Sequence, residues 1–170
     1  MKNFPVYILL IAVLSWSGIA CEKETVHFCP MGSLEYMIFG HFYGECVGEG
    51  CVEIYKIDFF DKTLAENTDD IYPSGAGPYE GENYNFLSNE QYNLVKNLVD
   101  DFPAQLLSED THVFGNPDGG DWGGLYVEIR RFGDAAGSGF WLLDKNEENM
   151  PEVYNAFADR INDKIALINE

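Results

Sequence analysis

The sequence has few basic residues. Ten Lys and Arg stand against 29 Asp and Glu in 170 residues, so the formal net charge is −19. Binding a phosphate backbone requires clustered Lys and Arg, and the one adjacent basic pair is Arg130-Arg131. The composition therefore excludes nucleic acid as a partner and disfavours adhesion to anionic lipid. It favours a cationic protein partner.

An apolar run long enough to cross a bilayer is also lacking. A transmembrane helix needs about 20 predominantly apolar residues, whereas the N-terminal apolar stretch runs only from Val6 to Trp16. Lys2 precedes the stretch and small residues follow it. This order is typical of an export signal, which is removed from the mature protein.

Residues Gly18-Ile19-Ala20-Cys21 end that signal. They resemble the lipobox of bacterial lipoproteins, in which small residues precede a cysteine that is acylated and becomes the new N-terminus. The resemblance implies a lipoprotein signal peptide over 1–20, lipidation of Cys21 with palmitate, and a tether over 21–33. An ordinary secretory signal is the alternative, because it shares the small-residue cleavage pattern.

The same resemblance implies a location. Lipoproteins of this class are often retained at the inner membrane by Asp after the acylated cysteine, and Glu22 occupies that position here. We therefore expect an exported chain that is held by its lipid in the outer membrane of a Gram-negative bacterium.

Three further cysteines are Cys29, Cys46 and Cys51. Export to an oxidising compartment favours disulfides, and the glycine-rich turn between Cys46 and Cys51 can fold back on itself. We expect these two to be bonded, although Cys29 could pair with either. Zinc binding with His41 is disfavoured, because the spacing matches no usual zinc pattern.

No catalytic set is recognisable. The three histidines, His27, His41 and His112, are scattered, and the residues around Ser138 lack the spacing of a nucleophile elbow. Adjacent carboxylates occur throughout so acidic a chain and carry no information about acid–base chemistry. We therefore expect no enzyme activity.

Hydrophobic patterning predicts an α+β fold. β-branched and aromatic runs predict strands over 34–43, 51–60 with a turn into 63–65, 112–114, 125–130 and 139–143. A capping box from Ser88 to Gln91 starts a helix that Pro103 ends. A second helix opens at Pro151, and its apolar stripe comprises Val153, Phe157, Ile161, Ile165 and Ile168.

These elements predict one domain over 34–170, an antiparallel sheet with two amphipathic helices packed on one face. Their order resembles an uncharacterised family of exported bacterial lipoproteins. The shared features are the Gly/Cys-rich turn from Gly44 to Cys51, a helix introduced by Leu87-Ser88, the loop Pro117-Asp118-Gly119 and a C-terminal helix. The resemblance implies no known activity and no catalytic residue.

The loop Asn116–Gly124 is a candidate binding site. Asn116, Asp118 and Asp121 offer oxygen ligands for Ca²⁺, although the spacing is not that of an EF-hand. No other cofactor is expected. The alternative is a glycine-rich connection in which Asp and Asn serve turn geometry.

Aromatic residues suggest a second use of this loop. Trp122 lies in it, and Tyr72, Tyr79, Tyr84 and Phe86 lie in an earlier segment. Aromatic faces beside carboxylates can bind glycans, whereas the alternative is that these side chains anchor the loops by packing.

The sequence therefore favours a membrane-anchored envelope lipoprotein that is a non-enzymatic interaction or structural protein with a cationic partner. The alternative is a glycan- or Ca²⁺-binding module. A concave pocket joining Trp122, Asp118 and Asp121 to the earlier tyrosines would favour the second.

Overall fold

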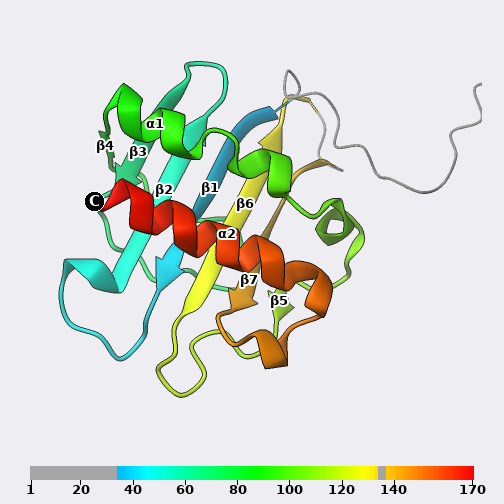
Figure 1. Ribbon diagram of the computed structural model, residues 1–170. Helices are drawn as coiled ribbons and strands as arrows, with labels where there is room; N and C mark the ends of the chain where they lie inside the picture. Colours follow the sequence, from blue (N-terminus) through cyan, green and yellow to red (C-terminus); the bar gives the residue numbers. More distant parts are fainter. Residues whose placement is uncertain (1–33, 134–136) are drawn as a thin grey trace, which may run out of the picture.

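A computed structural model of the chain describes residues 34–133 and 137–170 (Figure 1). The predicted signal peptide, Cys21, the tether and Cys29 lie outside the described residues. The strands are β1 Leu34–Phe42, β2 Val52–Asp58, β3 Thr63–Asn67, β4 Tyr84–Phe86, β5 Val113–Phe114, β6 Gly124–Arg131 and β7 Gly139–Asp144. The helices are α1 Asn89–Val95 and α2 Glu152–Ile168, with short 3-10 turns η2 Glu49–Cys51, η3 Leu98–Asp101, η4 Ala104–Ser108 and η6 Glu147–Asn149.

The strands form one seven-stranded sheet in the order β4-β3-β2-β1-β6-β7-β5. Every neighbouring pair is antiparallel except β5 and β7, which are parallel. The predicted α+β class and its mostly antiparallel sheet are confirmed, but a fully antiparallel sheet is wrong. The chain crosses from β4 at one edge of the sheet to β5 at the other through α1, η3 and η4. After this crossing, β5 joins the sheet parallel to β7.

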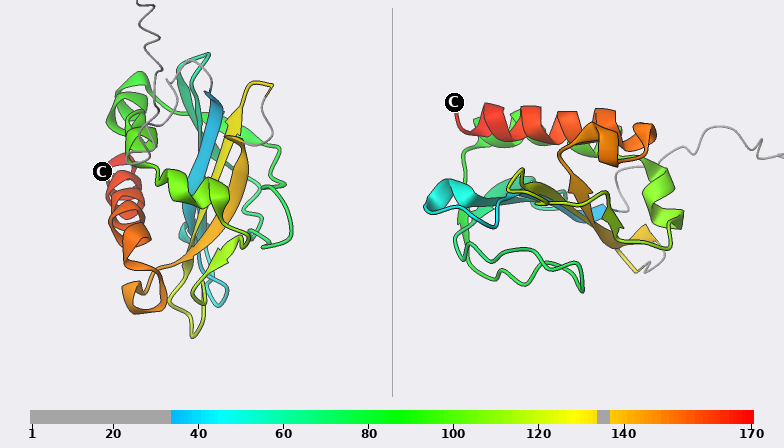
Figure 2. Two further views of the ribbon diagram at one scale, coloured as in Figure 1. Left: turned by 90° about the vertical axis from the view of Figure 1, so that its right-hand side faces the viewer. Right: turned by 90° about the horizontal axis from the view of Figure 1, so that it is seen from below.

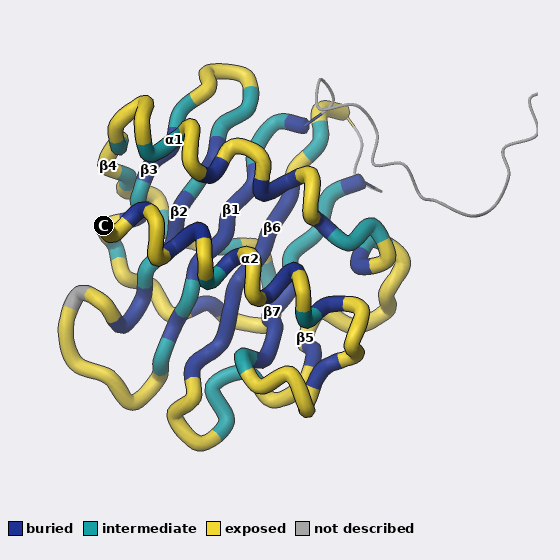
Figure 3. The backbone as a smooth tube through the Cα atoms, in the orientation of Figure 1, coloured by how far each residue is buried: buried dark blue, intermediate teal, exposed yellow. Residues whose placement is uncertain are grey.

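One face of the sheet carries the main hydrophobic core. Alternating side chains such as Met37 and Phe39 of β1 form a single cluster with Val95 of α1 and with Tyr154 and Phe157 of α2. Figure 2 shows α2 lying across this face, and Figure 3 shows the buried residues concentrated in the central strands. The sheet is thus one wall of a continuous core.

Segment 68–83 lies on the opposite side of the sheet from α2 (Figure 2). A smaller cluster occupies this second face, including Ile38, Ile54 and Tyr126, and Tyr79 of the segment packs against it. Asp69 closes the segment at its base, because its carboxylate accepts hydrogen bonds from the backbone of Glu82 and Asn83 at 2.7 and 2.9 Å. These bonds lower the pKa of Asp69 to about 2.

Glu128 of β6 holds this segment to the sheet. The side chain is buried, with 5% exposed. Its Oε1 accepts a hydrogen bond from the Tyr36 hydroxyl at 2.8 Å, and its Oε2 accepts from the Tyr126 hydroxyl at 2.7 Å and from the Tyr79 backbone N–H at 3.0 Å. Burial and the hydrogen bond to Glu128 raise the pKa of Tyr36. The carboxylate therefore joins β1, β6 and segment 68–83.

The helices differ from the prediction in detail. The capping box at Ser88 and Gln91 is present, but α1 ends at Val95 rather than near Phe102, and a 3-10 turn follows. Asn97, a poor helix former, lies at the break.

Two further differences concern single elements. In α2, Tyr154 is buried and Val153 is exposed, so the predicted stripe is wrong at its first position. Tyr84 and Phe86, treated above as loop residues, belong to β4, which pairs with β3.

We predict that Glu128→Ala destabilises the domain by about 3 kcal/mol, because the two tyrosine hydroxyls and the Tyr79 amide lose a charged acceptor in a buried place. Urea unfolding measures this change. Glu80→Ala, an exposed carboxylate in segment 68–83, is the control and should stay within about 0.5 kcal/mol of the wild type. Equal effects of the two substitutions would contradict the role of Glu128.

Candidate functional site

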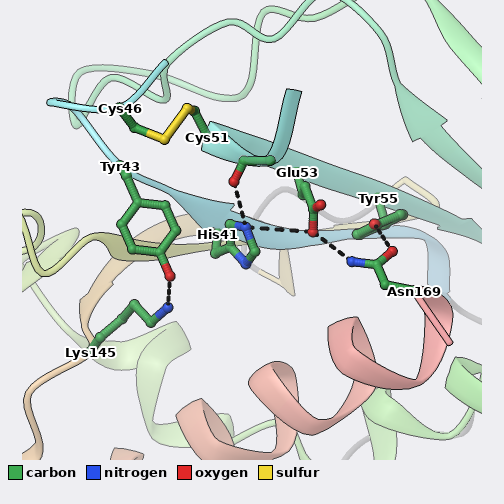
Figure 4. Close-up of polar contacts among 9 residues, drawn as sticks. His41, Tyr43, Cys46, Cys51, Glu53, Tyr55, Lys145 and Asn169 are labelled. Atoms are coloured by element: carbon green, nitrogen blue, oxygen red, sulfur yellow. Dashed lines mark hydrogen bonds and ion pairs between the residues drawn. A yellow bond between two sulfur atoms is a disulfide. The ribbon is translucent and has the colours of Figure 1, made fainter. Parts of the chain in front are cut away.

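Polar side chains gather where β1 ends and β2 begins (Figure 4). The residues directly opposite in the hairpin are His41 and Glu53, and His41 Nε2 lies 3.5 Å from Glu53 Oε2. The same histidine nitrogen is 3.3 Å from the Gly50 carbonyl oxygen. Asn169, after α2, donates from Nδ2 to Glu53 at 2.8 Å and accepts from the Tyr55 hydroxyl at 3.1 Å. The C-terminal end of α2 is therefore tied to this site.

The disulfide Cys46–Cys51 closes the turn beside these residues, with Cα atoms 5.5 Å apart. This confirms the predicted bond. The Tyr43 N–H donates to the Cys51 carbonyl at 2.8 Å, which continues the β1–β2 hairpin into the closed turn. The disulfide consequently constrains the backbone around Gly50, whose carbonyl oxygen contacts His41.

His41 is only slightly exposed, which sets its protonation. Burial lowers its pKa below the usual 6.5, Glu53 opposes the shift and Lys145 adds to it. The neutral imidazole is thus favoured near pH 7, so that this ring can accept or donate a hydrogen bond without carrying a charge.

Lys145 follows β7 and brings a cation to the same end of the sheet. Its Nζ donates a hydrogen bond to the Tyr43 hydroxyl and lies 4.6 Å from the centre of that ring. The rings of Tyr43 and His41 meet edge to face at 5.2 Å. A row of side chains therefore runs from Lys145 through Tyr43 to His41 and Glu53.

Asp118 places the loop Asn116–Gly124 against this end. One carboxylate oxygen accepts from the Gly44 N–H at 2.7 Å and from the Tyr72 hydroxyl at 2.9 Å, and the other accepts from the Gly123 N–H at 3.2 Å. A Cβ on Gly44 would lie 2.3 Å from that first oxygen, so a larger residue at this position would displace the Asp118 carboxylate. Burial and the bond to Asp118 raise the pKa of Tyr72 to about 12.

Two of the predicted calcium ligands take part in hydrogen bonds that hold the loop. The Asn116 N–H donates to Asp144 at 2.7 Å, while Asp118 has the three partners described above. Asp118 and Asp121 have positive φ angles of 62° and 65°, a region that Asp tolerates in turns. Within 34–133 and 137–170, no three His, Cys, Asp or Glu side chains are grouped for a metal ion.

Trp122 is well exposed, with 73% of its surface accessible. A cavity of about 520 Å³ lies beside it and is lined by Trp122, Lys145, Asn146 and Glu148. Tyr72 is linked to this loop through Asp118. An aromatic face, a cation, an amide and a carboxylate thus surround one open hollow.

The other predicted aromatics lie elsewhere. The Tyr79 ring lies 5.7 Å from the Tyr126 ring, and its hydroxyl donates to Asn67 at 2.9 Å. Tyr84 of β4 lies near Lys56 of β2. The residues that line the cavity beside Trp122 do not include these tyrosines.

His112 and Ser138 line a second cavity, of about 500 Å³, near the β6–β7 connection. The His112 ring stacks on Phe140 at 4.5 Å and its Nδ1 is 3.0 Å from the Phe140 carbonyl. Ser138 accepts from the Arg131 N–H at 2.9 Å. Both side chains therefore stabilise the surrounding backbone.

Sequence reasoning did not identify the His41–Glu53 pair or the Tyr43–Lys145 contact. A signal for the first was available, since pairing the two strands on either side of the Cys46–Cys51 turn places residues 41 and 53 opposite each other. No local signal links Tyr43 to Lys145, because the contact joins residues 102 positions apart.

No family model matches the chain, and no curated protein and no solved structure matches it either. Among the described residues, no helix has the length and apolar character needed to span a membrane.

We predict that stability falls on acidification partly because of His41. Its folded pKa is below the unfolded value of 6.5, so below about pH 6.5 the unfolded chain binds a proton that the folded protein does not. In His41→Gln, stability should therefore decline less between pH 7 and pH 5 than in the wild type. Thermal unfolding across this range measures the slopes, which should coincide above pH 7.5. Parallel slopes between pH 7 and 5 would contradict the assignment.

Proposed function

We propose that this protein is a membrane-anchored lipoprotein of the cell envelope that acts without catalysis, by binding a cationic protein partner. In this proposal the chain is exported, lipidated at Cys21 and held at the outer membrane. The domain is taken to have both helices on one face of its sheet, which the core shared by α1, α2 and the sheet supports.

Charge supports the choice of partner. If every Lys and Arg were paired with one carboxylate, the net charge of −19 would remain unbalanced. Glu148 lines the cavity beside Trp122, and the neighbouring residues in sequence, Asp121 and Glu147, are exposed, as is Glu45 before the disulfide turn. Such a surface attracts a basic protein and increases the rate of encounter at low salt.

The direction of β1 is the observation that carries the proposal. The strand begins at Leu34, where the expected tether ends, and finishes at Phe42, beside His41 and the disulfide turn. Nine residues of strand separate these ends by about 30 Å. The acidic end of the sheet is defined here as the end that carries the disulfide turn and the loop Asn116–Gly124. A chain held by its N-terminus therefore presents this acidic end away from its attachment.

The partner is tested by cross-linking the full-length protein in intact envelopes, then measuring the isoelectric point of what is captured. We predict capture of a basic protein by the wild type, weakened by high salt and reduced several-fold by Asp121→Asn with Glu148→Gln, because rim charges act through screened attraction. Glu80→Gln with Asp159→Asn removes the same charge from other exposed positions and should leave capture unchanged. A neutral or acidic partner, or equal loss in both double variants, would contradict the proposal.

A second candidate function, glycan binding, is favoured by the cavity beside Trp122. An exposed indole with hydrogen-bonding neighbours can stack on a sugar ring while Lys145, Asn146 and Glu148 contact hydroxyl groups. Calcium binding at Asn116, Asp118 and Asp121 remains part of this alternative, although the cation would compete with the three hydrogen bonds that Asp118 accepts.

For this alternative we predict that calorimetry detects saturable binding of envelope oligosaccharides. Trp122→Ala should lower the binding affinity at least tenfold. The matched control is Phe86→Ala, which removes an aromatic ring of similar exposure, 75%, from β4. Chelation of Ca²⁺ during the same titration shows whether the cation takes part. Absence of binding by the wild type would rule out the glycans tested.

A further inference from the structure

Two exposed phenylalanines form a pair at the end of the sheet opposite the site just described. Phe60 lies in the β2–β3 connection and is 77% exposed, and Phe132 directly follows β6 and is 53% exposed. Their ring centres are 6.4 Å apart and the rings meet edge to face. Two neighbouring exposed rings form a small apolar patch, a feature found at surfaces that contact apolar partners.

The strand register places this pair beside the first described residues of the chain. Phe59 N–H donates to the Glu35 carbonyl at 3.1 Å, so the β2–β3 connection adjoins the start of β1 on one side. Arg131 pairs with Leu34 on the other side. In Figure 1 the β2–β3 connection, the end of β6 and the start of β1 lie together at the upper end of the sheet. The aromatic pair therefore flanks the point at which the expected tether joins the domain.

Charge at this end differs from that of the whole chain. The described residues of the two connections and the start of β1 include Lys62, Arg130 and Arg131, against Glu35, Asp58 and Asp61. One oxygen of Asp58 accepts the backbone N–H groups of Phe60 and Asp61 at 2.9 and 2.8 Å, which directs that carboxylate into its own turn. The described residues at this end thus include as many basic as acidic side chains, whereas the whole chain has a net charge of −19.

We propose that this end contacts the lipid bilayer, with Phe60 and Phe132 inserted at the boundary between headgroups and acyl chains. The inference rests on the proposed anchoring through Cys21. Residues 22–33 span at most about 43 Å when fully extended, so the anchor keeps the pair at high local concentration beside the membrane. Aromatic rings favour this boundary, and Lys62 and Arg130 can extend their charged groups toward lipid phosphates. The orientation leaves the acidic end facing away from the lipid.

The test uses tryptophan as a depth probe in the full-length lipidated protein, reconstituted in vesicles of phosphatidylethanolamine and phosphatidylglycerol with brominated acyl chains. Phe60→Trp and Phe132→Trp are made in a Trp122→Phe background, which removes an exposed native indole. Val47→Trp, at a fully exposed position in the disulfide turn at the opposite end of the sheet, is the control. We expect bromine to quench the emission at positions 60 and 132 at least twofold more strongly than at position 47.

Sedimentation of the same samples separates the two proposals. Vesicle-bound protein with equal quenching at all three positions overturns the membrane contact and leaves the anchoring intact. Wild-type protein that fails to sediment with vesicles, or sedimentation unaffected by Cys21→Ser, overturns the anchoring and this inference with it. Hydrogen exchange of the wild type is the second measurement: we expect slower exchange over 59–62 on vesicles than in detergent, and unchanged exchange there counts against the contact.

Discussion

The buried carboxylate of Glu128 is the interaction on which the second face of the sheet depends. A charge in this position would be unfavourable by itself, but three donors from Tyr36, Tyr126 and Tyr79 replace the water it has lost. Because one donor belongs to segment 68–83, the sheet acquires a cover on this side that contains neither helix nor strand. That cover also brings Tyr72 to Asp118, so the position of the loop Asn116–Gly124 depends on it in turn.

Much of the fold follows from local pattern. Alternation along β1 and β6, the capping box at Ser88 and the apolar stripe of α2 each specify an element without reference to the rest of the chain. Local pattern does not specify the two-residue strand β5 or its parallel pairing with β7. A strand this short forms only through its hydrogen bonds with the neighbouring strand. The early end of α1 is likewise not specified by local pattern. A 3-10 turn after Val95 buries Leu98 and Val99 as a longer helix would, so the apolar spacing does not distinguish the two.

The candidate site was less accessible to sequence reasoning. The disulfide could be predicted, because both cysteines lie in one glycine-rich turn. Trp122 was identified as a candidate, yet the Lys145 that lines the same cavity comes from the other side of the β6–β7 hairpin. Asp118 illustrates the opposite case: a residue chosen as a metal ligand from its neighbours in sequence has its carboxylate engaged by Gly44, Tyr72 and Gly123.

The central position of β1 has a mechanical consequence. This strand is hydrogen-bonded along nearly its whole length to β2 on one side and β6 on the other, both antiparallel. Suppose the N-terminus is pulled while the opposite end is held. The load then acts along the strand, and the hydrogen bonds, which lie perpendicular to it, are sheared together instead of opening one after another. The domain is thereby built to resist traction applied through its own first strand.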